Sequence, residues 1–209
     1  MKIGLPLHRD QCGASAVEFA LVLPLLLLLL LGLIDAGRFM WEYNQAEKAT
    51  QMGVRYAVAT AVVPAGLGTY SFASQGGVTA GESVPSSSAG SPPAWFGSAT
   101  CNNASCTCSG SSGICNVIGY DSTAFTAIVG RMNKMYHGAT APRVSVEYRN
   151  VGLGFSGDPN GPDVAPLVTV RLTGMRFQPL STMMLGLGVD MPDFRAALTL
   201  EDGSGAVAN

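Results

Sequence analysis

Charged residues are scarce in this sequence: they make up 12% of its 209 residues, and the formal net charge is only −2. A surface that binds nucleic acid needs clustered lysine and arginine to neutralise phosphates. The chain has no basic footprint of that kind, so we expect no nucleic-acid partner. A chain of this length has room for one membrane segment and one modest external domain.

Histidine is also scarce, with only His8 and His137. Neither has a carboxylate or a nucleophile at a spacing typical of a catalytic site, and no glycine-rich phosphate loop follows an expected strand. We therefore expect no enzymatic activity, no catalytic residue, no cofactor and no metal site. His137 fits better at a helix end, where it would favour the helix dipole.

What the sequence does contain is one long apolar block near its N-terminus. The stretch from Phe19 to Ile34 is uncharged, but its sixteen residues would span only about 24 Å as a helix. Starting at Ala14 gives 21 residues and about 31 Å, which matches the hydrocarbon core of a bilayer. We therefore predict a transmembrane segment over residues 14–34, and this segment includes Glu18.

A short polar leader, residues 1–13, precedes this segment. Because Lys2 and Arg9 lie in the leader, the positive-inside rule favours a cytoplasmic N-terminus and an external C-terminal domain. A conventional secretory signal peptide fits less well. The apolar block is too long for the apolar region of a signal peptide, and Asp35-Ala36-Gly37 is a poor cleavage site.

The carboxylate of Glu18 is the anomaly in the apolar block. Burying such a group in lipid is unfavourable by about a few kcal/mol, so Glu18 needs a partner. Cleavage between Gly13 and Ala14 would create an α-amine at the start of the helix. In a packed assembly, the new amine of Ala14 on one subunit could form an ion pair with Glu18 of a neighbouring subunit.

The helical pattern continues beyond the apolar block. A stripe of mostly small residues recurs at three- and four-residue steps on one face: Ala36, Phe39, Tyr43, Ala46, Thr50, Gly53, Ala57 and Thr60. We predict one long helix over residues 14–63, ended by Pro64 and Gly66. The small residues on the stripe favour close packing against a sheet or neighbouring helices.

A loop rich in glycine, serine and proline is expected over residues 64–115, and it carries four cysteines. Even, clustered cysteines in a translocated segment are typical of disulfides, whereas structural zinc sites have a different spacing. A bond between Cys106 and Cys108 would be strained. Two pairings remain open: Cys101 with Cys106 and Cys108 with Cys115, or Cys101 with Cys108 and Cys106 with Cys115.

Residues 116–209 predict an external α+β domain. A helix is expected over residues 122–137, capped by Asp121 or Ser122 and ended by Gly138. Three strand patterns follow at 143–149, 166–176 and 194–200, with a long hairpin connection between the first two and a short helix or loop at 179–187. The predicted fold class is α+β: a long, partly transmembrane N-terminal helix packed on a small antiparallel sheet of three or four strands.

The N-terminal region resembles the TadE-like minor pseudopilins of the tight-adherence (Flp) branch of type IV pilus systems. The resemblance covers residues 9–58 and is carried by three motifs: Gly13-Ala14-Ser15-Ala16-Val17-Glu18-Phe19-Ala20-Leu21-Val22-Leu23-Pro24, Asp35-Ala36-Gly37-Arg38 and Gly53-Val54-Arg55-Tyr56-Ala57. It implies a pilin-like fold, with Gly13 before the bond cut by a prepilin peptidase and Glu18 at the family's acidic position. Phe19 stands where major pilins of this branch carry tyrosine, which favours a minor subunit.

The resemblance also implies a location and partners. The expected location is the bacterial inner membrane, as a single-pass protein with a periplasmic C-terminal domain, followed by incorporation into a pilus used in cell adhesion. The expected partners are a prepilin peptidase, sibling minor pseudopilins, the major pilin, the pilus assembly platform and the lipid bilayer. The alternative is a membrane-anchored receptor or adhesin whose external domain binds a ligand while the uncleaved helix serves as an anchor.

Overall fold

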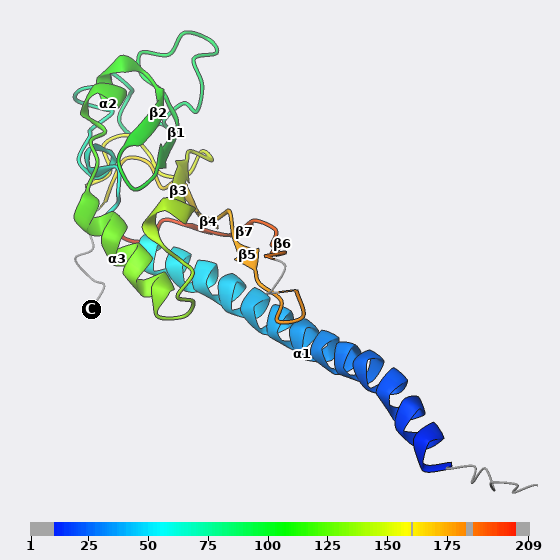
Figure 1. The fold of residues 1–209 in the computed structure, drawn as a ribbon. Helices are drawn as coiled ribbons and strands as arrows, with labels where there is room; N and C mark the ends of the chain where they lie inside the picture. Colours follow the sequence, from blue (N-terminus) through cyan, green and yellow to red (C-terminus); the bar gives the residue numbers. More distant parts are fainter. Residues whose placement is uncertain (1–10, 160, 183–185, 204–209) are drawn as a thin grey trace, which may run out of the picture. The chain divides into compact units, whose positions relative to one another are not determined.

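The computed structural model of the chain describes residues 11–159, 161–182 and 186–203 (Figure 1). The elements in chain order are α1 (Gln11–Val58), η1 (Ala65–Gly68), β1 (Phe96–Cys101), β2 (Cys106–Gly110), α2 (Ser112–Val117), α3 (Ser122–Asn133), η2 (Ala141–Arg143), β3 (Val144–Arg149), β4 (Leu167–Leu172), β5 (Arg176–Phe177), β6 (Val189–Asp190) and β7 (Phe194–Thr199).

The chain divides into two compact units, which are described separately below. Unit 1 comprises Met1–Trp41 and Phe177–Val189, and unit 2 comprises Glu42–Arg176 and Asp190–Asn209. Helix α1 therefore contributes its apolar N-terminal part to unit 1 and its C-terminal part to unit 2. A second, two-stranded sheet pairs β5 with β6.

Unit 2 is built on an antiparallel sheet of five strands in the order β2-β1-β3-β4-β7. The α+β class is thus confirmed, with one strand more than the upper limit of the prediction. Strands β3, β4 and β7 fall where alternating apolar residues predicted them. The second strand pattern, at 166–176, is interrupted after Leu172, and Gly174 there adopts a φ of +67°.

The two additional strands, β1 and β2, correct the prediction of a loop over residues 64–115. Their sequences, Phe-Gly-Ser-Ala-Thr-Cys and Cys-Thr-Cys-Ser-Gly, are rich in small polar residues and have weak intrinsic β-propensity. They form strands because β1 pairs with β3, from Ser98 opposite Arg149 to Cys101 opposite Val146. Tertiary pairing, rather than local pattern, therefore decides the structure here.

Four of the five cysteines form two disulfides, and the structure selects the first of the two open pairings. Cys101–Cys106 joins directly opposite residues of β1 and β2. Cys108–Cys115 ties β2 to the short helix α2. The prediction of disulfides is thus confirmed, and both bonds fasten the β1–β2 edge of the sheet.

The part of the small-residue stripe from Ala46 to Ala57 packs within unit 2, as predicted, whereas Ala36 at its start belongs to unit 1 and is exposed. Ala46, Thr50 and Ala57 are fully buried. A Cβ atom added at Gly53 would lie 2.7 Å from Met132 Cγ on α3 and 3.4 Å from Val170 Cγ1 on β4. Glycine at this position therefore allows α1 to approach both the sheet and α3 closely.

Helix α1 ends at Val58, five residues earlier than predicted. The carbonyl of Val58 accepts hydrogen bonds from the amides of Glu201 (3.0 Å) and Asp202 (2.9 Å), instead of from the amide four residues later in the helix. The hydroxyl of Thr60 donates to the carbonyl of Tyr56 at 2.8 Å, which satisfies another carbonyl of the last turn. A distant segment of the chain thus caps the helix before Pro64 is reached.

Helix α3 begins as predicted but ends early. The Asp121 carboxylate caps it by accepting from the amides of Thr123 (2.8 Å) and Ala124 (3.0 Å). The helix ends at Asn133, four residues short of the prediction. The Asn133 side-chain amide donates to the carbonyl of His137 at 3.1 Å, so this side chain stabilises the following turn instead of a further helical turn.

The segment between α1 and β1 is irregular but packed. Its buried hydrophobic residues are Val62, Val63, Leu67, Tyr70, Phe72, Val78, Val84 and Ala94. The Asn150 side-chain amide donates to the carbonyls of Val84 and Phe96, both at 2.9 Å. Gly66 is needed where this segment meets α2, because a Cβ there would collide with the carbonyl of Val117.

Tyr148 is the largest fully buried side chain of the core. Its hydroxyl oxygen accepts a hydrogen bond from the amide of Val63 at 3.2 Å, just after α1. Burial raises the pKa of Tyr148 well above the usual value, and the hydrogen bond from Val63 opposes this shift only in part. The phenol therefore stays neutral and fixes the chain that leaves α1.

We predict that Tyr148→Phe destabilises the chain by about 1–3 kcal/mol, because the buried Val63 amide loses its acceptor. The wild-type chain should lose stability as the pH rises above the ordinary tyrosine pKa of 10.0, since ionisation is disfavoured only in the folded state. The variant should show a shallower alkaline loss. Urea unfolding in detergent between pH 7 and 11 measures both effects, with the half-buried Tyr56→Phe as a control. Equal alkaline slopes for wild type and variant would contradict this role.

Candidate functional site

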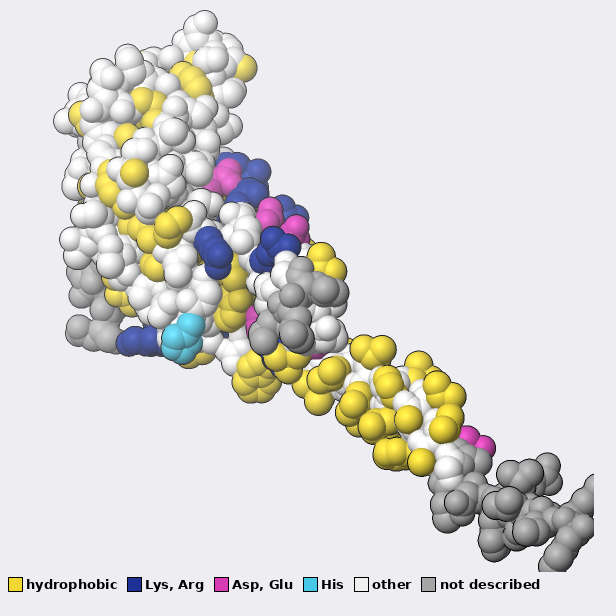
Figure 2. Space-filling view, in the orientation of Figure 1, with side chains coloured by type: hydrophobic (Ala, Val, Ile, Leu, Met, Phe, Trp, Pro, Cys, Tyr) yellow, Lys and Arg dark blue, Asp and Glu magenta, His cyan; other side chains and the backbone are white. Residues whose placement is uncertain are grey.

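The N-terminal part of α1, in unit 1, exposes a continuous apolar surface. It contains an 18-residue window with a mean hydropathy of 2.8, none of it buried inside the molecule. Figure 2 shows this stretch as a nearly continuous hydrophobic surface. The large exposed side chains are Val17, Phe19, Leu21, Val22, Leu25 to Leu30, Leu33 and Ile34. Such a patch is far larger than a soluble monomer normally exposes, and it is compatible with a single-pass membrane anchor.

The residues predicted for cleavage and assembly lie together near the start of α1. Gly13 is exposed, and a Cβ added there would meet nothing within 4 Å. Glu18 is exposed, and Phe19 is 65% exposed. The side chain of Ala14 and the leader residues 1–10 lie outside the described part of the chain. The helix already begins at Gln11, so it runs through the predicted scissile bond.

Within the described residues, Glu18 has neither a hydrogen-bonding nor an ion-pair partner. This is consistent with a partner supplied by another molecule. The predicted pair between Ala14 and Glu18 joins two subunits after cleavage, so it stays a prediction. The four disulfide-bonded cysteines belong to unit 2, and the structure therefore does not combine them with Gly13 and Glu18 in one unit.

Asp35, at the end of the apolar stretch, makes contacts that the sequence did not reveal. Its carboxylate accepts two backbone hydrogen bonds, from the amide of Leu180 at 2.7 Å and from the amide of Ser181 at 2.9 Å. The residue is only 7% exposed. Although desolvation opposes ionisation, the hydrogen bonds from Ser181 and Leu180 and the charge of Arg38 together lower the pKa of Asp35.

Arg38 and Phe39 complete this contact one turn further along α1. The Arg38 guanidinium lies 3.5 Å from the Asp35 carboxylate and 5.4 Å from the ring centroid of Phe177. Phe39 packs edge-on against the same ring, with the centroids 5.5 Å apart. The residues Asp35, Arg38 and Phe39 thus hold the segment after β5 against α1 at the end of the apolar stretch.

We predict that Asp35→Ala loosens this segment without unfolding unit 2. The amides of Leu180 and Ser181 lose a charged acceptor worth about 1.5–3 kcal/mol, so their hydrogen exchange should accelerate about tenfold or more. Amides of β3 serve as the internal control and should be unaffected. In the wild type, the contact should weaken only at a pH below the ordinary carboxyl pKa of 3.8, since the folded-state pKa is lowered. Unchanged exchange at residues 180–181 would refute the anchoring role.

The comparisons with known proteins agree with the placement of these residues. Residues 13–55 match the model of the family described as TadE-like protein, so the match begins at the predicted cleavage residue and lies entirely within α1. No curated protein and no solved structure matches the chain. Helix α1 is therefore the part of the chain that is similar to TadE-like proteins.

Proposed function

We propose that this protein is a minor pseudopilin, a non-catalytic subunit for assembly of a tight-adherence (Flp) pilus. In this proposal, a prepilin peptidase cuts the precursor between Gly13 and Ala14. The observation that carries the proposal is the exposed apolar surface of α1 with one carboxylate, Glu18, for which the described chain supplies no partner. The TadE-like match over residues 13–55 supports the same function.

Cleavage and assembly are linked through charge. Before cleavage, a helix that carries Glu18 in lipid bears a carboxylate without a counter-ion, which is unfavourable by about a few kcal/mol. Cleavage creates the α-amine of Ala14. In the assembled pilus, this amine forms an ion pair with Glu18 of the neighbouring subunit, where the low dielectric strengthens the attraction. Only processed subunits can form the pair, so processing precedes incorporation.

The rest of α1 fits the same sequence of events. The protein is held in the inner membrane by residues 14–34, with its N-terminus in the cytoplasm and unit 2 in the periplasm. The assembly platform then moves the helix from lipid into a bundle formed with sibling pseudopilins and the major pilin. The exposed leucines exchange lipid contacts for helix contacts, so this transfer changes apolar burial little. The external domain supplies specific contacts between subunits.

We predict that Gly13→Val abolishes processing while leaving folding and membrane insertion intact. The structure has open space at this position, so the added side chain disturbs no contact. Intact-mass measurement should find a mature N-terminus at Ala14 for the wild type, and only the precursor for the variant and for cells that lack the peptidase.

The matched control is Gly32→Val, which makes the same change at another glycine of α1 with nothing within 4 Å. This variant should be processed normally. A wild-type mature N-terminus at any other residue, or normal processing of the Gly13 variant, would count against the leader and its cleavage site.

We further predict that Glu18→Leu inserts as well as the wild type but lowers piliation at least about tenfold, as expected for the loss of an ion pair worth about 1.4 kcal/mol or more. Immunoblots of membranes and pilus counts by electron microscopy measure the two quantities. The conservative change Glu18→Asp keeps the charge and should retain part of the assembly. Full piliation with Glu18→Leu would favour the alternative function, a receptor or adhesin with an anchoring helix.

A further inference from the structure

The outer face of the five-stranded sheet carries a second charged feature, separate from α1. On β4, Val168, Val170 and Leu172 are fully buried, and Val170 lies against α1. Because side chains alternate along a strand, the other residues of β4 project from the opposite face. These residues are Leu167, Thr169 and Arg171.

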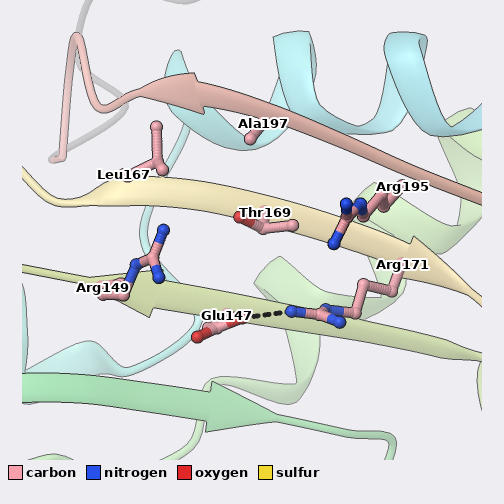
Figure 3. Close-up of a pocket in the computed structure, with 7 residues that line it drawn as sticks. All are labelled: Glu147, Arg149, Leu167, Thr169, Arg171, Arg195 and Ala197. Carbon is pink, nitrogen blue, oxygen red and sulfur yellow. Dashed lines mark hydrogen bonds and ion pairs between the residues drawn. The ribbon is translucent and has the colours of Figure 1, made fainter.

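The strand register places three arginines around a shallow part of this face, where the central side chains are short. Arg171 of β4 lies directly opposite Arg195 of β7, and Arg149 of β3 lies opposite Leu167. A depression of about 380 Å³ opens between them. Figure 3 shows the side chains that line it. We call it the arginine groove. Its lining residues are Glu147, Arg149, Leu167, Thr169, Arg171, Arg195 and Ala197.

The charges of the arginine groove are not balanced. The guanidinium of Arg171 pairs with the carboxylate of Glu147 at 2.9 Å. Across the ranges that the structure describes, no carboxylate pairs with Arg149 or Arg195. Three cations therefore face one anion on a chain whose net charge is −2. The direct opposition of Arg171 and Arg195 is itself unfavourable, because like charges opposite each other destabilise a sheet. A bound anion would relieve this repulsion.

The shape of the groove limits what the anion can be. Thr169 and Ala197 form a low floor, and the groove is open, whereas a site for a small molecule usually encloses its ligand. None of the lining residues is aromatic, so the groove offers no stacking platform for nucleobases. A guanidinium fork matches the geometry of a carboxylate and can bind it with two hydrogen bonds.

The spacing of the arginines suits an extended chain. Arg149 is separated from the row of Arg171 and Arg195 by four residue steps along the strands, or about 13 Å. An extended peptide that lies across the strands between these rows sends alternate side chains to its two sides. Acidic side chains at neighbouring positions would therefore reach guanidinium groups on both walls. We infer that the arginine groove binds an extended acidic segment of a partner protein.

Glu147 competes with an incoming carboxylate for the guanidinium of Arg171. Its side chain is only 22% exposed, and it holds the Arg171 guanidinium on the groove wall. An incoming carboxylate must share Arg171 with Glu147 and is repelled by it. Removing the charge of Glu147 should therefore tighten binding of an acidic segment, whereas removing an arginine should weaken it. These opposite expectations separate a binding role from general damage to the fold.

The test measures the binding of labelled peptides to the full chain in a zwitterionic detergent. The probes are fluorescein-labelled Gly-Glu-Glu-Gly-Glu-Glu-Gly and the same peptide with glutamine in place of each glutamate. Fluorescence anisotropy at low salt should give an affinity at least about tenfold higher for the glutamate peptide, and this preference should fall as salt is added. Equal affinities for the two peptides would overturn the proposal.

The variants locate the binding on the molecule. Arg149→Gln and Arg195→Gln should each weaken binding of the glutamate peptide about fivefold or more, and Glu147→Gln should strengthen it about threefold. Lys134→Gln removes one exposed charge at the end of α3 and serves as the matched control, with no change expected. Binding that survives both arginine changes would exclude the groove. Tighter binding of a polyuronate than of the glutamate peptide would exclude a peptide as its ligand. Neither outcome depends on the pilus role of α1.

Discussion

Helix α1 has to satisfy two environments within a single continuous element, and the rest of the structure follows from this constraint. In unit 1 its large side chains are exposed, with leucine on every side, as a helix surrounded by lipid or by other helices requires. In unit 2 the same helix changes to small residues, because the sheet and α3 approach closely at Gly53. Asp35 lies between the two regimes and uses its carboxylate to fix a loop instead of extending the apolar surface.

The parts of the fold that the sequence predicts are those whose pattern is local in the chain. The apolar block, the small-residue stripe and the alternating strands β3, β4 and β7 are local periodic patterns, and each predicts its element directly. The Asp121 cap is equally local, because its partners lie two and three residues away. Strands β1 and β2 have no such pattern, since their register depends on β3 and on the disulfides. The end of α1 depends on amides more than 140 residues away.

The candidate site residues also differ in whether the sequence alone reveals their role. Glu18 is visible in the sequence because a carboxylate in an apolar block is a chemical anomaly at a single position. The role of Asp35 is hidden, because its partners are backbone amides at residues 180 and 181, and a backbone amide leaves no mark on a sequence. The arginine groove is hidden for a third reason. Arg149, Arg171 and Arg195 are more than twenty residues apart in the chain, and only the strand register brings them together.

If α1 is inserted in a membrane and the chain enters a pilus, as we propose, the two charged features face different dielectrics. In an apolar surrounding, an unpaired carboxylate at Glu18 is strongly disfavoured. Incorporation would therefore require a neighbouring subunit that supplies the ion-pair partner. On the wet face of the sheet, screening makes unpaired arginines tolerable, and contacts there are weak and depend on salt. In such a subunit, the ion pair of α1 would hold the subunit in the filament. Binding of a partner segment in the arginine groove would stay reversible.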